Sequence, residues 1–412
     1  MSNKLIFSIG IFFVLLILFI AAVLISEYRN MDRLKEEYPN ISERAYDYRK
    51  SRLKVWAVNL ILKFLFPLLF LTTGLSKKIG SFAQGSGRGL FLTGLIYVII
   101  FSLIDLLVSL PTGFYGGFIL KHRYGLSNQS IFRWLELVLK SFTLNTLVFS
   151  LVVWFPYYLI YNSPNRWWLY LGLLSIPVIA FTTFISPMYV DPIFNRYTSI
   201  EDEELGRDIK KLLQKANIED AKIYKVDKSR DTKEMNAYMT GIFKSKRIVL
   251  WDTTIENLGR DEVLAVTAHE IGHYIKGHIW KSIILGGLFS ILLIYLVYIT
   301  SNWMLINSRG AFGFNRLSDM ASLPLIILVL NFYMFLANPI INLASRQMER
   351  EADLVEIELT KNKEAAISTM IKLNQGNLSI PRPSKIYKTW YHTHPPTEER
   401  IKFFEDYQYS NR

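Results

Sequence analysis

The chain has 412 residues, 51% of them hydrophobic and 20% charged, with a formal net charge of +12 and no cysteine. The lack of cysteine excludes disulfides, thiolate metal ligands and a thiol nucleophile. The apolar residues are gathered into runs long enough to cross a bilayer, which is not the pattern of a soluble globular protein. We find no nucleic-acid-binding motif, and the positive charge fits loops that flank a membrane and contact anionic lipid.

Seven apolar stretches are predicted to be membrane-spanning helices, because a bilayer core about 30 Å thick requires about 20 apolar residues per helix. The first is followed by the charged segment SEYRNMDR without a small-residue cleavage site, so we expect a retained span and not a signal peptide. Two spans contain a charged residue, Lys63 and Asp105, which should face each other or a watery interior. The seven stretches are residues 5–25, 56–75, 89–110, 143–162, 167–186, 282–300 and 323–344.

Two hydrophilic blocks, residues 187–281 and the tail from 345, are separated by two spans and must lie on the same face of the membrane. The loops 26–55 and 111–142 fall on that face and carry twelve Lys and Arg residues, against seven on the opposite face. Because positively charged loops are retained in the cytoplasm, this bias predicts that the hydrophilic blocks face the cytoplasm.

The first hydrophilic block combines helical and strand patterns. Helical spacing covers residues 202–216 and 259–280, the second with two acidic residues in its first turn, which suits the helix dipole. Between these helices, residues 221–227 and 246–252 contain alternating or β-branched apolar side chains, which is typical of strands. We therefore expect a small α+β unit in this block.

The second of these helices contains the sequence His269-Glu270-Ile271-Gly272-His273. Residues four apart share one helix face, so the two imidazoles can bind one tetrahedral cation such as zinc. Glu270 is offset along the same helix and can reach a water molecule bound to the metal, the general-base arrangement of a metallopeptidase. The motif therefore predicts zinc-dependent hydrolysis of peptide bonds.

A catalytic zinc site requires a third protein ligand and leaves the fourth position to water. His278 lies five residues after the motif, on another helix face, and is expected to be an ordinary polar residue near the helix end. The helical segment 344–359 offers Glu349, Glu351 and Asp353. Spacing alone does not choose among them, although Glu349 and Asp353 share a face, so that one could bind zinc while the other orients a ligating histidine.

The order of motifs resembles the type 1 CaaX prenyl protease family, polytopic zinc endopeptidases of the gluzincin class that are related to HtpX. The resemblance rests on HEIGH followed downstream by S-R-x-x-E-x-x-A-D, which begins at Ser345. It extends to HRYGLSNQS, DPIFNRYTSIED, SRDTKEMNAYMTGIFKSKRIVLWDT and HPPTEERI, and so covers most of the chain. The resemblance implies one Zn²⁺ per chain, with Glu349 as the third ligand and Asp353 behind His269.

The resemblance also implies residues that act on the substrate. His394 and Arg400 would contact the substrate or stabilise the oxyanion, and Asn236 would lie in the cleft near the substrate backbone. From the residues themselves, strand 246–252 directly precedes the zinc helix, and if it is an edge strand an extended peptide can add to it. The expected partners are a peptide or protein substrate, with a prenylated C-terminus as one option, and membrane lipid.

The implied fold is mainly α: seven transmembrane helices enclose a polar chamber that is capped by a small α+β zinc protease domain of the gluzincin type. The predicted domains are residues 1–186 (spans one to five with polar loops), 187–281 (first part of the protease domain), 282–344 (spans six and seven) and 345–412 (second part of the protease domain).

Three alternatives stay open at this point. An HtpX-like quality-control protease shares the two zinc motifs but usually has fewer spans, and residues 26–190 fit it poorly. A site-2-type intramembrane protease would carry HExxH inside a span, which the charged neighbours here oppose. A zinc-binding membrane scaffold with vestigial activity is disfavoured by the intact Glu270. The short loop 301–322 and the compact length favour a bacterial inner membrane, with the endoplasmic reticulum membrane as the alternative.

Overall fold

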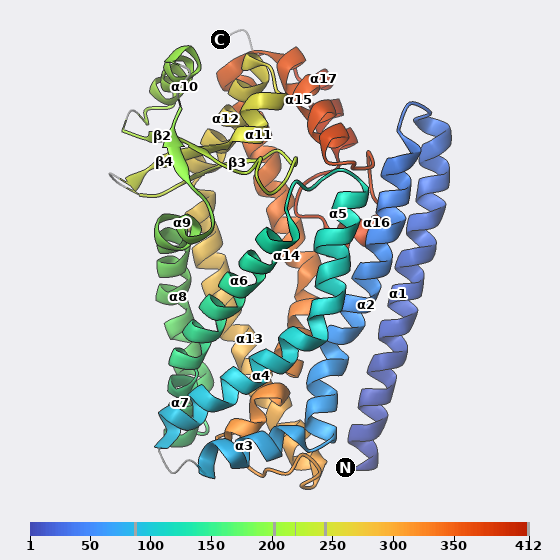
Figure 1. The fold of residues 1–412 in the computed structure, drawn as a ribbon, viewed down its shortest axis with the longest axis vertical. Helices are drawn as coiled ribbons and strands as arrows, with labels where there is room; N and C mark the ends of the chain where they lie inside the picture. The colour runs from blue at the N-terminus through green and yellow to red at the C-terminus, as the bar shows by residue number, and fades with distance from the viewer. Residues whose placement is uncertain (86–88, 201–202, 219, 243–244, 410–412) are drawn as a thin grey trace.

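The computed structural model describes residues 1–412 apart from 86–88, 201–202, 219, 243–244 and 410–412. Long helices run through most of the molecule, and a small sheet with several shorter helices covers one end (Figure 1). The N-terminus lies at the end of the bundle away from this cap, and the C-terminus lies at the cap. The predicted class, a mainly helical membrane protein with a small α+β cap, is confirmed.

Seven helical segments among the described residues are long and apolar enough to cross a membrane, as the sequence predicts. Four of them are composite, because π-helical turns join α4 to α5 and α8 to α9, α6 passes into α7 at Val153, and a 3-10 turn (Met320–Ser322) leads into α14. The spans are formed by α1 (Asn3–Glu37), α2 (Glu43–Thr72), α4 (Gly89–Phe114) with α5 (Leu120–Arg123), α6 (Ile131–Val152) with α7 (Trp154–Asn162), α8 (Trp167–Ile185) with α9 (Asp191–Phe194), α13 (His278–Ser308) and α14 (Leu323–Thr360).

α14 is the central helix of the bundle. In its most apolar window 56% of the residues are buried, against 6–28% in the other six spans. It packs on α2 and α13 through a core that includes Phe64, Leu71, Leu325 and Val329. The same helix continues without a break past the predicted domain boundary at residue 344, so one element is both the seventh span and the start of the second hydrophilic block.

The sheet has four strands in the order β1-β2-β4-β3. The inner pair β2 and β4 is parallel, and both outer strands are antiparallel to their neighbours. The hypothesis that 246–252 is an edge strand is therefore wrong, because β4 lies between β2 and β3. The strands are β1 (Tyr197–Ser199), β2 (Lys222–Val226), β3 (Ala237–Thr240) and β4 (Arg247–Trp251).

Residues 259–280 form two helices and not one. α12 ends at Ile275, and Gly277 has a left-handed backbone with φ 65°, after which α13 begins at His278. Glycine adopts this conformation without the strain that a side chain would cause. The sixth span therefore begins immediately after the helix that carries HEIGH.

The cap is held together by a core of its own between the sheet and helices α10 and α12. Leu205, Ile209, Ile248 and Val263 are among its buried residues. At the start of α12, the Glu262 carboxylate accepts hydrogen bonds from Ser368 and Lys372 of α15, which joins the two hydrophilic blocks. The remaining helices are α3 (Leu75–Gly85), α10 (Glu203–Lys215), α11 (Asp252–Asn257), α12 (Arg260–Ile275), α15 (Lys363–Gly376), α16 (Lys385–Tyr391) and α17 (Thr397–Asp406).

A cavity of about 1060 Å³ lies between α4, α6 and the base of the cap. Arg133 on α6 binds both oxygens of Asp231 in the cap at 2.9 and 3.0 Å. This ion pair links the cap to α6, one of the helices beside the cavity. Asp105 lines this cavity, as expected for a charged residue within a span, whereas Lys63 does not. Its polar lining includes Ser102, Asp105, Ser109, Ser141, Asn145, Thr146, Asp191, Lys228, Asp231 and Glu234.

Candidate metal centre

His269 and His273 project from one face of α12. Their Nε2 atoms are 3.2 Å apart, and their ring centroids are 4.9 Å apart with nearly perpendicular planes. His269 is buried and His273 is partly buried. Both rings point into the same space because residues i and i+4 of a helix lie one above the other.

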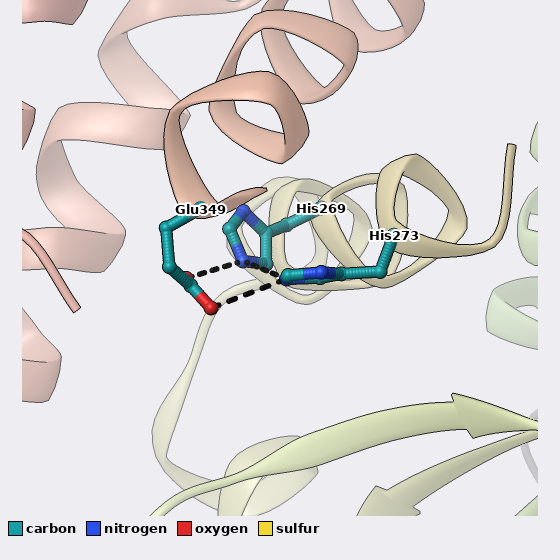
Figure 2. A group of neighbouring side chains, drawn as sticks. All are labelled: His269, His273 and Glu349. Atoms are coloured by element: carbon teal, nitrogen blue, oxygen red, sulfur yellow. Dashed lines mark hydrogen bonds and ion pairs between the residues drawn. The ribbon is translucent and has the colours of Figure 1, made fainter. Parts of the chain in front are cut away.

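Glu349 on α14 completes a group of three (Figure 2). Its Oε2 lies 3.3 Å from His269 Nε2, and its Oε1 lies 3.4 Å from His273 Nε2. α14 approaches α12 this closely because Gly272 has no side chain. A Cβ at that position would lie 3.0 Å from both the Cα and the carbonyl oxygen of Ala352.

The three side chains fit a zinc ion. Glu349 Oε2 is buried and makes no hydrogen bond, and a buried carboxylate oxygen of this kind is costly unless a cation satisfies it. Burial lowers the pKa of His273 to about 3, so its imidazole is neutral, as a metal ligand must be. Two nitrogens and one oxygen with a fourth position left open form the ligand set of a catalytic zinc site.

Asp353, one helical turn beyond Glu349, supports the outer nitrogen of His269. Its Oδ1 lies 2.9 Å from His269 Nδ1, and Arg400 donates to both oxygens of the same carboxylate. Burial disfavours a positive charge on His269, but the carboxylates of Asp353, Glu349 and Glu356 raise its pKa well above the ordinary value. The carboxylates around this ring create a negative potential, which also favours a metal cation at Nε2 of a neutral His269.

A second set of possible ligands, His269, Asp353 and Glu356, lies on the outer side of the His269 ring. The guanidinium of Arg400 already occupies that space, with Nη2 3.2 Å from His269 Nδ1 and bonded to Asp353. A fixed positive charge at this position opposes a second cation. Glu356 is fully buried and neither of its oxygens is hydrogen-bonded, a feature that sequence reasoning missed.

Glu270 lines a cavity of about 410 Å³ together with His269. Burial raises the pKa of the Glu270 carboxyl to about 7, against smaller opposing contributions from the positive charges of His269 and Arg400. A carboxyl with a pKa near neutrality can both accept and return a proton, as a general base in peptide hydrolysis must. The structure thus places Glu270 beside the metal group, and its catalytic role stays a prediction.

His394 and Asn236 line the same cavity. His394 Nε2 lies 3.4 Å from Glu349 Oε1, and its side chain is 61% exposed, so it is free to contact a bound molecule. Asn236 immediately precedes β3, and its exposed side chain accepts a hydrogen bond from the Ala237 N–H. Both residues are therefore brought to the metal group from distant parts of the chain, and their roles also stay predictions.

Arg400 differs from what the resemblance implies. Its Nε donates to Asp353 Oδ2 at 3.0 Å and its Nη2 donates to Oδ1, so these donors are not free for an oxyanion. The residue lines the cavity, but it lies behind His269. This geometry favours an indirect role, in which Arg400 binds the Asp353 carboxylate and that carboxylate contacts His269.

These features define a class of protein. A helix with HExxH, a glutamate from a second helix and an open cavity, all at one end of a seven-span bundle, form a polytopic membrane metallopeptidase of the gluzincin class. Residues 199–408 match the model of peptidase family M48, and residues 32–196 match that of the CAAX prenyl protease N-terminal region with five membrane helices. The chain belongs to peptidase family M48, whose metalloproteases are in general zinc-dependent, and it is a multi-pass membrane metalloendopeptidase.

Similar proteins cover most of the chain. The uncharacterized metalloprotease YhfN of Bacillus subtilis is 35% identical over 83% of this chain and 80% of its own length. CAAX prenyl protease 1 of Saccharomyces cerevisiae is 30% identical over 74% of this chain and 71% of its own. The crystal structure of S. mikatae Ste24p superposes with a TM-score of 0.83 at 25% identity, over 95% of this chain and 97% of that one.

Proposed function

We propose that the protein binds one Zn²⁺ per chain through His269, His273 and Glu349 and uses it to hydrolyse peptide bonds. The observation that carries this proposal is the convergence of two Nε2 atoms on the buried Glu349 carboxylate, whose Oε2 makes no hydrogen bond. Zinc in such a site would act as a Lewis acid and would lower the pKa of a bound water molecule to about 7.

The surrounding residues have distinct tasks in this proposal. Glu270 accepts the proton of the attacking water and returns it to the leaving amine, so that no covalent intermediate with the protein is needed. His394, exposed beside Glu349, donates a hydrogen bond to the oxyanion. Asp353 and Arg400 keep the His269 ring in its orientation.

An extended peptide is expected to bind along β3. This strand pairs on one side with β4, and among the described residues no strand pairs with its other side. The cavity that contains Glu270 is lined by Asn236 and Ala237 at the start of the same strand. Backbone hydrogen bonds to an edge strand hold a peptide in an extended form, and Asn236 would then contact its main chain.

We propose that the active site can process peptides with a prenylated C-terminus, because relatives from several eukaryotes have the name CAAX prenyl protease 1. The bacterial relative, which is 35% identical, supports a bacterial cell membrane over the endoplasmic reticulum. In a bacterium the natural substrate would be another membrane-attached peptide that uses the same site. The charge bias of the loops supports a cytoplasmic protease domain.

The test is cleavage of a farnesylated C-terminal CaaX peptide by the detergent-purified protein, with zinc chelation and Glu270→Ala as controls. We expect cleavage that requires both zinc and Glu270. Zinc bound at one per chain without cleavage would retain the metalloprotease but move the substrate toward unfolded membrane proteins. A protein that binds no zinc at all would contradict the proposal.

A further inference from the structure

His278 is buried against the outer side of a proposed zinc ligand. Its Nδ1 lies 2.8 Å from Nδ1 of His273, whose other nitrogen, Nε2, belongs to the metal group. The residue is 4% exposed, and the two rings are nearly perpendicular with centroids 4.9 Å apart. His278 therefore contacts the ligand and does not belong to the group that would bind the metal.

The turn between α12 and α13 produces this contact. In a continuous helix a residue five positions after His273 would lie well around the helix axis, away from its ring. Lys276 and the left-handed Gly277 end α12, and the chain then turns into the sixth span. As the first residue of that span, His278 is carried back toward the zinc helix.

The contact continues to a carboxylate on α14. His278 Nε2 lies 3.1 Å from Glu351 Oε2, and Lys281 Nζ donates to the same oxygen at 2.8 Å. Glu351 is two residues beyond the ligand Glu349 and points to the other side of its helix turn. An unbroken series of contacts thus runs from the metal group through two imidazoles to a charged pair contributed by the two last spans.

Only one placement of protons satisfies every contact in this series. If Nε2 of His273 binds a metal, the proton of the neutral ring must lie on Nδ1. Nδ1 of His278 must then accept that proton in a hydrogen bond, which places the His278 proton on Nε2. From there it is donated to the Glu351 carboxylate, a group that can only accept when ionised. The carboxylate thus selects the tautomer of both rings.

We propose that His278 and Glu351 are positioning residues that fix the tautomer and orientation of the zinc ligand His273. The inference rests on the zinc site proposed above. It gives the two ligands different support: the outer nitrogen of His269 contacts a carboxylate directly, whereas that of His273 reaches one through a second imidazole. Hydrogen bonds of this kind hold a ligand ring in place and raise its basicity.

The test measures zinc affinity of the purified full-length protein by competition with a chelator, without any assay of turnover. His278→Leu removes both contacts, and we expect zinc binding about 10–100-fold weaker. His278→Asn places an amide oxygen near the former Nδ1 and retains an acceptor for His273, so it should restore most of the affinity. His278→Gln places its amide near the former Nε2, retains only the Glu351 contact and should resemble His278→Leu.

A matched control is His122→Leu. This histidine also contacts the chain through both ring nitrogens, at Phe118 and Gln129, but it lies outside the metal group and its supports. Zinc affinity should be unchanged in this variant. Cobalt(II) in place of zinc adds a second measurement, since its visible absorption should shift in His278→Leu and return toward the wild-type spectrum in His278→Asn.

The outcomes separate this inference from the zinc site itself. If the unmodified protein binds no zinc, the proposed function fails before the variants are compared. If it binds zinc and His278→Leu binds equally well, the positioning role is wrong. Equal losses in the Asn, Gln and Leu variants, together with a lower melting temperature of the zinc-free protein, would show that His278 only packs the helix junction and would also overturn the proposal. Rescue by Asn but not by Gln is the expected result.

Discussion

The metal centre and the cavity inside the bundle are both polar, but they hold their charges in different ways. Behind the metal group, the Asp353 carboxylate is 2% exposed and is bound by both a histidine and an arginine. In the cavity, Asp105 is exposed and makes no hydrogen bond or ion pair with any residue that the structure describes. Bond cleavage requires groups held at fixed positions. Of these two carboxylates, only Asp353 is held in this way.

The largest loss of turnover is expected from a substitution of Glu270, the proposed general base. Glu270→Gln removes the proton acceptor and leaves the three ligands in place. We expect turnover to fall by about 10²–10⁴-fold, the range for loss of a general base, while zinc content measured by atomic emission stays at one per chain. Unchanged turnover would exclude Glu270 as the base.

The arrangement of the metal group can also be disturbed by a substitution that changes no polar residue. Gly272→Ala places a methyl group 3.0 Å from the backbone of Ala352 and must push α14 away from α12. A displacement of about 1 Å can lower turnover by about 10²-fold, and zinc affinity should fall as well.

The control for that variant is Gly286→Ala in α13, where an added Cβ has no atom within 4 Å. It should leave both turnover and zinc affinity unchanged. Equal behaviour of the two alanine variants would show that the distance between α12 and α14 does not matter to the site.

A smaller effect on zinc affinity is expected for Asp353, which contacts the outer nitrogen of His269. Asp353→Asn keeps the shape of the side chain but removes the charge that His269 and Arg400 share. Loss of such a support typically weakens metal binding about 10–100-fold. The largely buried side chain of Arg400 also loses its partner, so the melting temperature should fall. Zinc affinity equal to that of the unmodified protein would show that this carboxylate is not needed to orient His269.

The smallest effect on the site is expected in the cavity. Asp105→Asn removes a charge from a span, where it costs at least roughly 2.5–3.5 kcal/mol on insertion scales. Zinc affinity should be unchanged, and thermal stability in detergent should stay equal or rise. A clear loss of zinc binding would contradict the separation of the two regions.

Much of this architecture is readable from the sequence because it depends on local periodicity. Apolar runs give the seven spans, and the spacing of His269 and His273 gives two imidazoles on one helix face. The even number of spans between the two hydrophilic blocks predicts that they meet at one end, where Glu262 joins them. Each of these inferences requires only residues that are near one another in the chain.

Features that depend on tertiary packing were not readable in the same way. The edge position of β3 follows from a parallel pairing of β2 with β4 that leaves no trace in either strand sequence. The salt bridge between Arg400 and Asp353 depends on how α17 meets α14. The contact of His278 depends on a backbone angle at Gly277, and a glycine there was the one available sign that the helix would end.

The uninterrupted course of α14 has a mechanical consequence. Its 38 residues make a rod about 57 Å long, nearly twice the thickness of a bilayer's hydrocarbon core of about 30 Å. Pro339 lies within it without ending the helix. Long spans adjust to the thickness of a bilayer by tilting. Glu349 lies on the part of this rod beyond the predicted span, so any tilt of the seventh span moves that carboxylate with it.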